Sequence, residues 1–219
     1  MAKTFKEKIN GIKYFVTADE SLESMVRILL NGIRNIPPEK AMRDDFRLEL
    51  LFSVYTFKKK LGGYQVMTQN YLGNALQEKT EDLTVALFLM MKQLLLVKQY
   101  QLEPASCRFD DKIILTKGAL ENQYISLDRN GDARPGDSGW FIQGLRMENG
   151  RPVPISPAGF EGVDPLPAEA YESIYACQLV QKRPSAAEVL LLPYNYCAIL
   201  NGEALQEILT DRNERLIGG

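Results

Sequence analysis

The feature that most constrains the fold is a change of sequence pattern at Pro104. Nine of the 11 prolines lie from Pro104 onward, and apolar residues recur at helical spacing before it and at strand-like spacing after it. With 219 residues the chain is long enough to bury a core without disulfides. The sequence predicts an α+β protein with an N-terminal helical bundle over residues 1–103 and a β-rich α+β domain, mostly antiparallel, over residues 104–219.

Helices are expected throughout the first part. The first has one apolar face, formed by Leu22, Met25, Val26, Leu29 and Ile33, behind a capping box at Thr17 and Glu20. A second is expected over 39–61, ending at Gly62-Gly63, and a short one over 69–77. The segment 83–97 is apolar nearly all round, which predicts a central helix with Leu87 and Leu94 in the core.

The second part is expected to contain short strands at 112–116, 122–127, 140–147 and 151–155. Asn149-Gly150 predicts a hairpin between the last two. A proline-rich loop should follow over 154–167, then strands at 175–181 and 189–192, and a closing helix at 203–209.

Composition narrows the classes of function. The chain has no histidine, which removes the usual general base and the commonest metal ligand, so we expect no enzyme, no metal site and no cofactor. A net charge of −2 argues against a general nucleic-acid binder. Cys107, Cys177 and Cys197 show no metal-ligand spacing and fit a reducing compartment. With no signal peptide and no long apolar segment, we expect a cytoplasmic, soluble protein that does not bind membranes.

The segment 128–140 carries the candidate motifs. Asp128, Asn130 and Asp132 match the first ligands of a calcium loop, but Ala133 and Gly139 occupy positions that need Gly and Glu. Ser138 lies in a Gly-Asp-Ser-Gly sequence like that of serine proteases, but that chemistry requires an imidazole. An Asp-rich and Gly-rich turn between strands explains both patterns.

A family resemblance rests on the same segment. Tyr124, Arg129, Asp137-Ser138-Gly139-Trp140 and Gly144 follow one another in an order that resembles a small bacterial domain, first catalogued as being of unknown function and later assigned to immunity proteins of polymorphic toxin systems. The likeness covers about residues 105–180. Leu145 stands where that domain has an acidic residue, and the helical first part lies outside the resemblance.

The resemblance implies a non-enzymatic protein that binds and neutralises a cognate toxin. The binding residues expected on this basis are Asp128, Arg129, Asp132, Asp137 and Trp140, with the carboxylates meeting a basic partner surface. The tryptophan can instead anchor the core. Two alternatives remain: a structural or adaptor subunit of a larger assembly, and a histidine-free enzyme using carboxylates. The partner is expected to be another protein, and the oligomeric state stays open.

Overall fold

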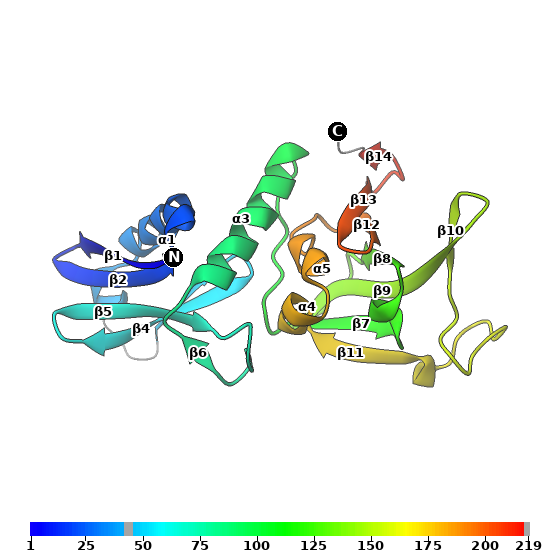
Figure 1. Cartoon of the computed structure of the whole chain (residues 1–219), viewed down its shortest axis with the longest axis horizontal. Coiled ribbons are helices and arrows are strands. Elements are labelled where there is room, and N and C mark those ends of the chain that lie inside the picture. The colour runs from blue at the N-terminus through cyan, green and yellow to red at the C-terminus, as the bar shows by residue number, and fades with distance from the viewer. Residues whose placement is uncertain (42–45, 217–219) are drawn as a thin grey trace. The chain divides into compact units, whose positions relative to one another are not determined.

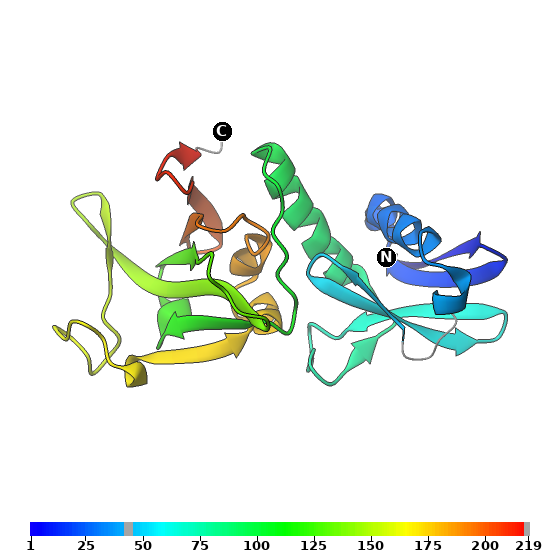
Figure 2. The same ribbon diagram turned by 180° about the vertical axis from the view of Figure 1, so that it is seen from behind.

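The computed structural model describes residues 1–41 and 46–216 and divides the chain into two compact units, Met1–Leu95 and Leu96–Gly219. Each unit is built on a mixed β-sheet (Figure 1, and from behind in Figure 2). Among the described residues, none of the helices is both long and apolar enough to cross a membrane.

The first unit begins with strands. In chain order its elements are β1 (Ala2–Ile9), β2 (Ile12–Asp19), η1 (Glu20–Leu22), α1 (Glu23–Arg34), α2 (Pro38–Ala41), β3 (Arg47–Leu50), β4 (Ser53–Lys60), β5 (Gly63–Gln69), β6 (Lys79–Thr80) and α3 (Thr84–Gln99). The sheet has the strand order β1-β2-β5-β4-β3, with β6 on β5. Strands β2 and β5 run parallel, and the other pairs are antiparallel.

The predicted N-terminal helical bundle is therefore wrong. Of the segment 39–61, only the start is helical, in the short helix α2. The described residues after it form β3 and β4, and the part at 42–45 lies outside the described residues. The stretch 52–57 buries consecutive apolar, aromatic and β-branched residues on both faces, a pattern that a strand accommodates better than a one-sided helix. At the N-terminus, β1 and β2 form a hairpin through Asn10-Gly11. This is the same turn signal that correctly placed the hairpin at Asn149-Gly150.

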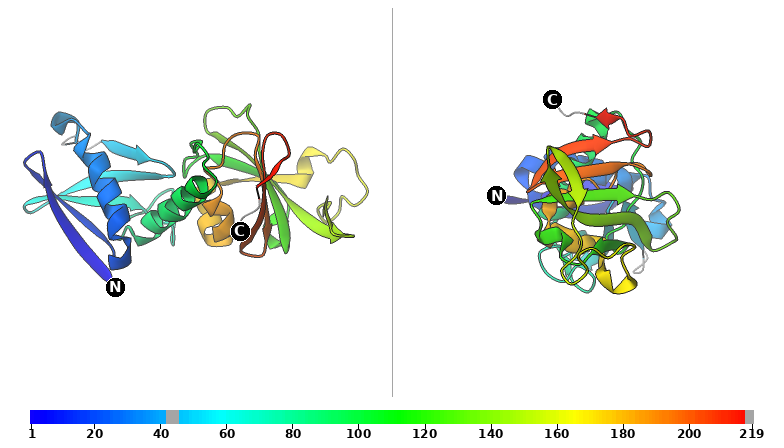
Figure 3. Two further views of the ribbon diagram at one scale, coloured as in Figure 1. Left: turned by 90° about the horizontal axis from the view of Figure 1, so that it is seen from above. Right: turned by 90° about the vertical axis from the view of Figure 1, so that its right-hand side faces the viewer.

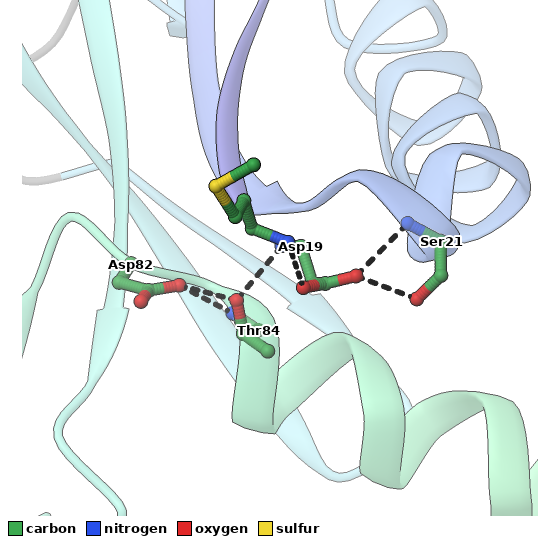
Figure 4. Close-up of polar contacts among 5 residues, drawn as sticks. Asp19, Ser21, Asp82 and Thr84 are labelled. Atoms are coloured by element: carbon green, nitrogen blue, oxygen red, sulfur yellow. Dashed lines mark hydrogen bonds and ion pairs between the residues drawn. The ribbon is translucent and has the colours of Figure 1, made fainter.

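Helices α1 and α3 match two of the predicted helices. The apolar face of α1 packs on the side of the sheet that carries Tyr14, Val16 and Tyr55, and Leu87 of α3 belongs to the same core. The predicted capping box is wrong because Thr17 lies in β2. Instead, the Asp19 carboxylate accepts the backbone N–H of Ser21 (3.0 Å), as Figure 4 shows.

A hydrogen-bonded junction joins β2 to the start of α3. The Asp82 carboxylate accepts both the backbone N–H (2.9 Å) and the hydroxyl (2.5 Å) of Thr84. The Thr84 hydroxyl in turn accepts the backbone N–H of Asp19 (2.9 Å) (Figure 4). The first turn of α3 is thereby fixed to the end of a strand far away in the sequence.

The second unit holds most of the predicted strands. Its elements are β7 (Lys112–Thr116), η2 (Ala119–Glu121), β8 (Tyr124–Arg129), β9 (Asp137–Glu148), β10 (Arg151–Pro154), η3 (Ala168–Ala170), β11 (Tyr171–Tyr175), α4 (Ala176–Lys182), α5 (Pro184–Glu188), β12 (Cys197–Asn201), β13 (Ala204–Leu209) and β14 (Arg215–Leu216). The strand order is β11-β7-β9-β8-β12-β13-β14, with β10 on β9. The parallel pairing of β7 with β9 makes the sheet mixed.

Three predictions in this unit are wrong. The segment 175–181 forms α4 instead of a strand, 189–192 forms a turn, and 203–209 forms β13 instead of a helix. The last error arises because the turn at Gly202 folds β13 back onto β12, and this pairing outweighs the helical propensity of Glu and Leu. The loop predicted over 154–167 is free of helix and strand after Pro154.

Candidate functional site

The Ser138 hydroxyl is used inside the fold. Its Oγ donates to the carbonyl oxygen of Lys112 (2.7 Å) and accepts the backbone N–H of Trp140 (3.1 Å). The residue is 2% exposed. The neighbouring Asp137 carboxylate accepts the backbone N–H of Gly139 (2.9 Å). Both side chains fix the turn that starts β9, because each bonds to backbone within the fold.

Gly139 is required by a close approach of two backbone segments. Its φ is +75°, and a Cβ atom there would lie 2.5 Å from the carbonyl oxygen of Asn130. The two residues also share a backbone bond, from the Asn130 N–H to the Gly139 carbonyl (2.8 Å). The motif therefore holds the loop after β8 against the start of β9.

Arg129 and Trp140 form one buried cluster. They are 2% and 1% exposed, and the guanidinium carbon lies 5.4 Å from the tryptophan ring. The indole N–H donates to the carbonyl oxygen of Leu190 (3.2 Å). The guanidinium carbon also lies 4.4 Å from the centre of the Tyr194 ring. The tryptophan is thus a core anchor, which is one of its two expected roles.

The Arg129 guanidinium ties two chain segments to the sheet. It donates to the carbonyl oxygens of Ala105 (3.3 Å), Ser106 (2.6 Å), Leu190 (3.1 Å) and Leu192 (2.5 Å). Burial lowers the pKa of Arg129. Since carbonyl dipoles and aromatic faces surround the charge, its role in this geometry is to hold loops in place.

The expected binding residues are therefore not gathered in one place. Arg129 and Trp140 meet in the core, Asp137 serves the turn, and Asp132 is exposed in the loop after β8. Asp128 precedes Arg129 in the same strand, and consecutive strand residues point to opposite faces. Asp128 accordingly lies on the face of the sheet opposite the cluster.

We call that opposite face the open face. It contains Asp128, one of the carboxylates expected to meet a basic partner, but its apolar members were not predicted from the sequence. Its pairings place one row of side chains across neighbouring strands: Ser173, Ile114, Phe141, Asp128, Cys197 and Leu209. Ile114 is 43% exposed, and Phe141, Asp128 and Leu209 are half-buried. The right-hand view in Figure 3 looks onto β8, β9, β12 and β13 with no described helix of this unit in front of them.

Asp128 is the carboxylate of this row. Its Oδ2 accepts the Ser126 hydroxyl (3.1 Å), and burial together with Asp128 raises the pKa of the adjacent Cys197 thiol. Within the described part of the chain, no Lys or Arg forms an ion pair with Asp128. A half-buried carboxylate between Phe141 and Cys197, in a row that continues to Ile114 on one side and Leu209 on the other, can accept a cation from a partner with little competition from water.

Other candidate chemistry finds no support in the geometry. Burial raises the pKa of Cys107 to about 12 and that of Cys177 to about 11, which disfavours the reactive thiolates. Over residues 1–41 and 46–216, no group of His, Cys, Asp and Glu side chains is arranged to hold a metal ion. Two grooves, of about 440 and 350 Å³, are lined by none of the predicted binding residues.

Comparison of the chain with protein-family models, with curated proteins and with solved structures found no match.

Proposed function

We propose that the protein is a non-enzymatic protein-binding protein and that the open face of the second unit is its binding surface. The observation that carries the proposal is the row formed by Ile114, Phe141, Asp128 and Leu209. It combines exposed apolar area with a carboxylate that has no ion-pair partner in the described chain. Interfaces often have this composition, with an aromatic anchor beside a polar group that fixes the register.

The partner that fits this surface is a protein with a basic side chain set among apolar ones. A Lys or Arg placed on Asp128 would be partly desolvated by Phe141 and Ile114, so the pair would strengthen binding and set its orientation. Because of the resemblance to immunity proteins, we favour a cognate bacterial toxin as the partner. The side chains of the Asp137–Trp140 motif stabilise the fold. The likeness therefore supports a fold similar to that of immunity proteins more directly than it supports similar contacts with a toxin.

The test is affinity capture from the native lysate with the whole chain, followed by mass spectrometry. Asp128→Asn and Phe141→Ala are compared with Glu103→Gln, which changes an exposed carboxylate away from the open face. We expect one small basic protein to be captured by the wild type and by Glu103→Gln, with capture reduced about tenfold or more by either open-face variant. Thermal melts check that each variant is folded.

Other results would redirect the proposal. Capture that is unchanged by Asp128→Asn and Phe141→Ala would exclude the open face. Recovery of several subunits of one complex would favour the adaptor role, and turnover on a substrate panel would favour the carboxylate-dependent enzyme.

A further inference from the structure

Two hairpin turns of the first unit lie side by side. Strand β2 starts after the Asn10-Gly11 turn and β5 starts after the Leu61-Gly62 turn. Because β2 and β5 pair in parallel, with Tyr14 opposite Tyr64, both turns lie at the same end of the sheet (Figure 1). The contact is close, since a Cβ atom on Gly63 would lie 2.0 Å from the carbonyl oxygen of Lys13.

Lysines gather at this end. We call it the basic hairpin end and define it by Lys6, Lys8, Lys13, Lys58, Lys59, Lys60 and Leu61. All of these side chains are exposed. Lys8 and Lys13 are directly opposite each other in the β1–β2 hairpin, an arrangement of like charges that destabilises a sheet.

Five of the six lysines share a face as well as an end. Lys59 lies on the other face, because it pairs with Tyr64, which is opposite Tyr14 on the side of the α1 core. Lys6 pairs with Phe15, and the Phe15 ring carries the amino groups of Lys60 at 4.2 Å and Lys13 at 5.4 Å. Phe15 points away from the α1 core, because its neighbours Tyr14 and Val16 point into that core. Of these amines, Lys58 pairs with Glu81 at 3.6 Å, a surface contact that leaves the patch strongly positive.

Leu61 stands at the tip. It is 100% exposed and separates the run Lys58-Lys59-Lys60 from Gly62. A turn tolerates small polar residues at such a position, so packing within the described fold gives no reason for a leucine. An exposed apolar side chain with lysine amino groups beside it can enter the boundary between lipid headgroups and acyl chains.

We propose that the basic hairpin end docks on an anionic lipid bilayer surface. The lysines would lie over the headgroup phosphates and Leu61 would enter the interface. Lysine is depleted in protein–protein interfaces, which disfavours an acidic protein as the partner. Phe15 is only 9% exposed, so it offers no ring on which a nucleic-acid base can stack. This partner differs from the expectation that the protein does not bind membranes. That expectation considered only a signal peptide and a long apolar segment, and a cluster of surface lysines requires neither.

The test is cosedimentation of the whole chain with vesicles of phosphatidylcholine alone or of phosphatidylcholine with phosphatidylserine, at low and high salt. We expect binding to the anionic vesicles only, weakened by salt. Lys58→Gln with Lys60→Gln should lower the partition coefficient roughly 25-fold, about fivefold for each lysine. Leu61→Ser should lower it roughly tenfold.

Matched controls keep the test sharp. Lys98→Gln with Lys117→Gln makes the same change of charge at exposed sites elsewhere, and Leu72→Ser changes another leucine, 73% exposed. Both controls should bind like the wild type. The proposal is overturned if the chain binds neutral vesicles as well as anionic ones, or if it binds neither. It is also overturned if the control variants lose as much binding as the Lys58, Lys60 and Leu61 variants. Retention of polyglutamate or single-stranded DNA without vesicle binding would overturn it as well and would assign the lysines to an acidic protein or a nucleic acid.

Discussion

Arg129 shows how one side chain can organise a unit. Its guanidinium joins the 105–106 and 190–192 segments to β8 through backbone carbonyl oxygens. Arg129→Met should lower the free energy of unfolding by about 3–5 kcal/mol, comparable to removing one partner of a buried charge pair. Arg129→Lys should also destabilise, because a single ammonium cannot reach carbonyls on two segments.

Urea denaturation measures both Arg129 variants. Arg151→Met, at an exposed site in β10, is the matched control and should be close to neutral. A loss below about 1 kcal/mol for Arg129→Met would contradict the anchoring role.

Two glycines of the same turn allow the cost of steric crowding to be distinguished from the cost of backbone strain. Gly136 (φ +84°) has nothing within 4 Å of its missing Cβ, whereas at Gly139 (φ +75°) that atom would lie 2.5 Å from the Asn130 carbonyl oxygen. Gly136→Ala should cost about 1–2 kcal/mol from the left-handed conformation alone. Gly139→Ala should cost clearly more, because β9 and the Asn130 loop must also move apart. Equal costs in thermal denaturation would argue against the close approach.

At the scale of elements, α3 tests which helix positions form the core. Leu87 is fully buried, whereas Leu94, predicted to be equally buried, is only partly so. Leu87→Ala should lower the free energy of unfolding by about 2–5 kcal/mol, and Leu94→Ala by clearly less. Leu95→Ala, at a site that is 54% exposed, is the control for the change in helix composition. A Leu87→Ala loss below about 0.5 kcal/mol would place α3 outside the core.

The junction between β2 and η1 predicts a dependence on pH. The Asp19 carboxylate accepts hydrogen bonds from the Ser21 hydroxyl, the amino group of Met1 and the backbone N–H of Ser21. These bonds hold the pKa of Asp19 well below its usual value. A carboxyl with a lowered folded-state pKa gives its full stability above the unfolded value of about 4 and loses it as the pH falls further. Asp19→Asn should therefore lower Tm at neutral pH and show a smaller drop in Tm on acidification.

Melting curves at about pH 7 and about pH 3 check the Asp19 prediction. Glu20→Gln changes the next exposed carboxyl and should keep the wild-type acid response. The prediction fails if Asp19→Asn and wild type lose the same Tm in acid.

At the scale of the whole molecule, each unit has its own stabilising cluster. The core that includes Tyr14, Leu29 and Leu87 is drawn from residues of the first unit, and the Arg129–Trp140 cluster belongs to the second. We expect Leu87→Ala to raise amide hydrogen exchange in β2, β4 and β5, and Arg129→Met to raise it in β8, β9 and β12. Mass spectrometry of peptides measures both effects. A uniform rise over both sheets would mean that the chain unfolds as one cooperative body.

Charge also becomes informative only at this scale. Residues 1–103 carry 15 Lys and Arg against 12 Asp and Glu. An excess of three positive charges over this length does not by itself indicate a basic surface. The hairpins bring lysines separated by some fifty positions, such as Lys8 and Lys60, to one end of the sheet. Local density, which the net charge does not report, controls attraction to a charged surface.

The sequence by itself determined features that depend on neighbouring residues. It placed α1 and α3, the strands β7 to β10 and the Asn149-Gly150 hairpin, because helical spacing, strand alternation and turn chemistry act over a few residues. It also contained the Asn10-Gly11 turn, a local signal for the β1–β2 hairpin that was missed.

Tertiary structure decided what depends on distant partners. The segment 52–57 forms part of a sheet because β5, and through it β2, pairs alongside it. Asp128 and Arg129 are adjacent in sequence, yet one faces an open surface and the other enters the core, since the register of β8 assigns alternate residues to opposite faces. The carbonyls around Arg129 come from segments some 20 and 60 residues away. Such contacts have no local signature in the chain, because the free energy that fixes them comes from burial and pairing in the assembled sheet.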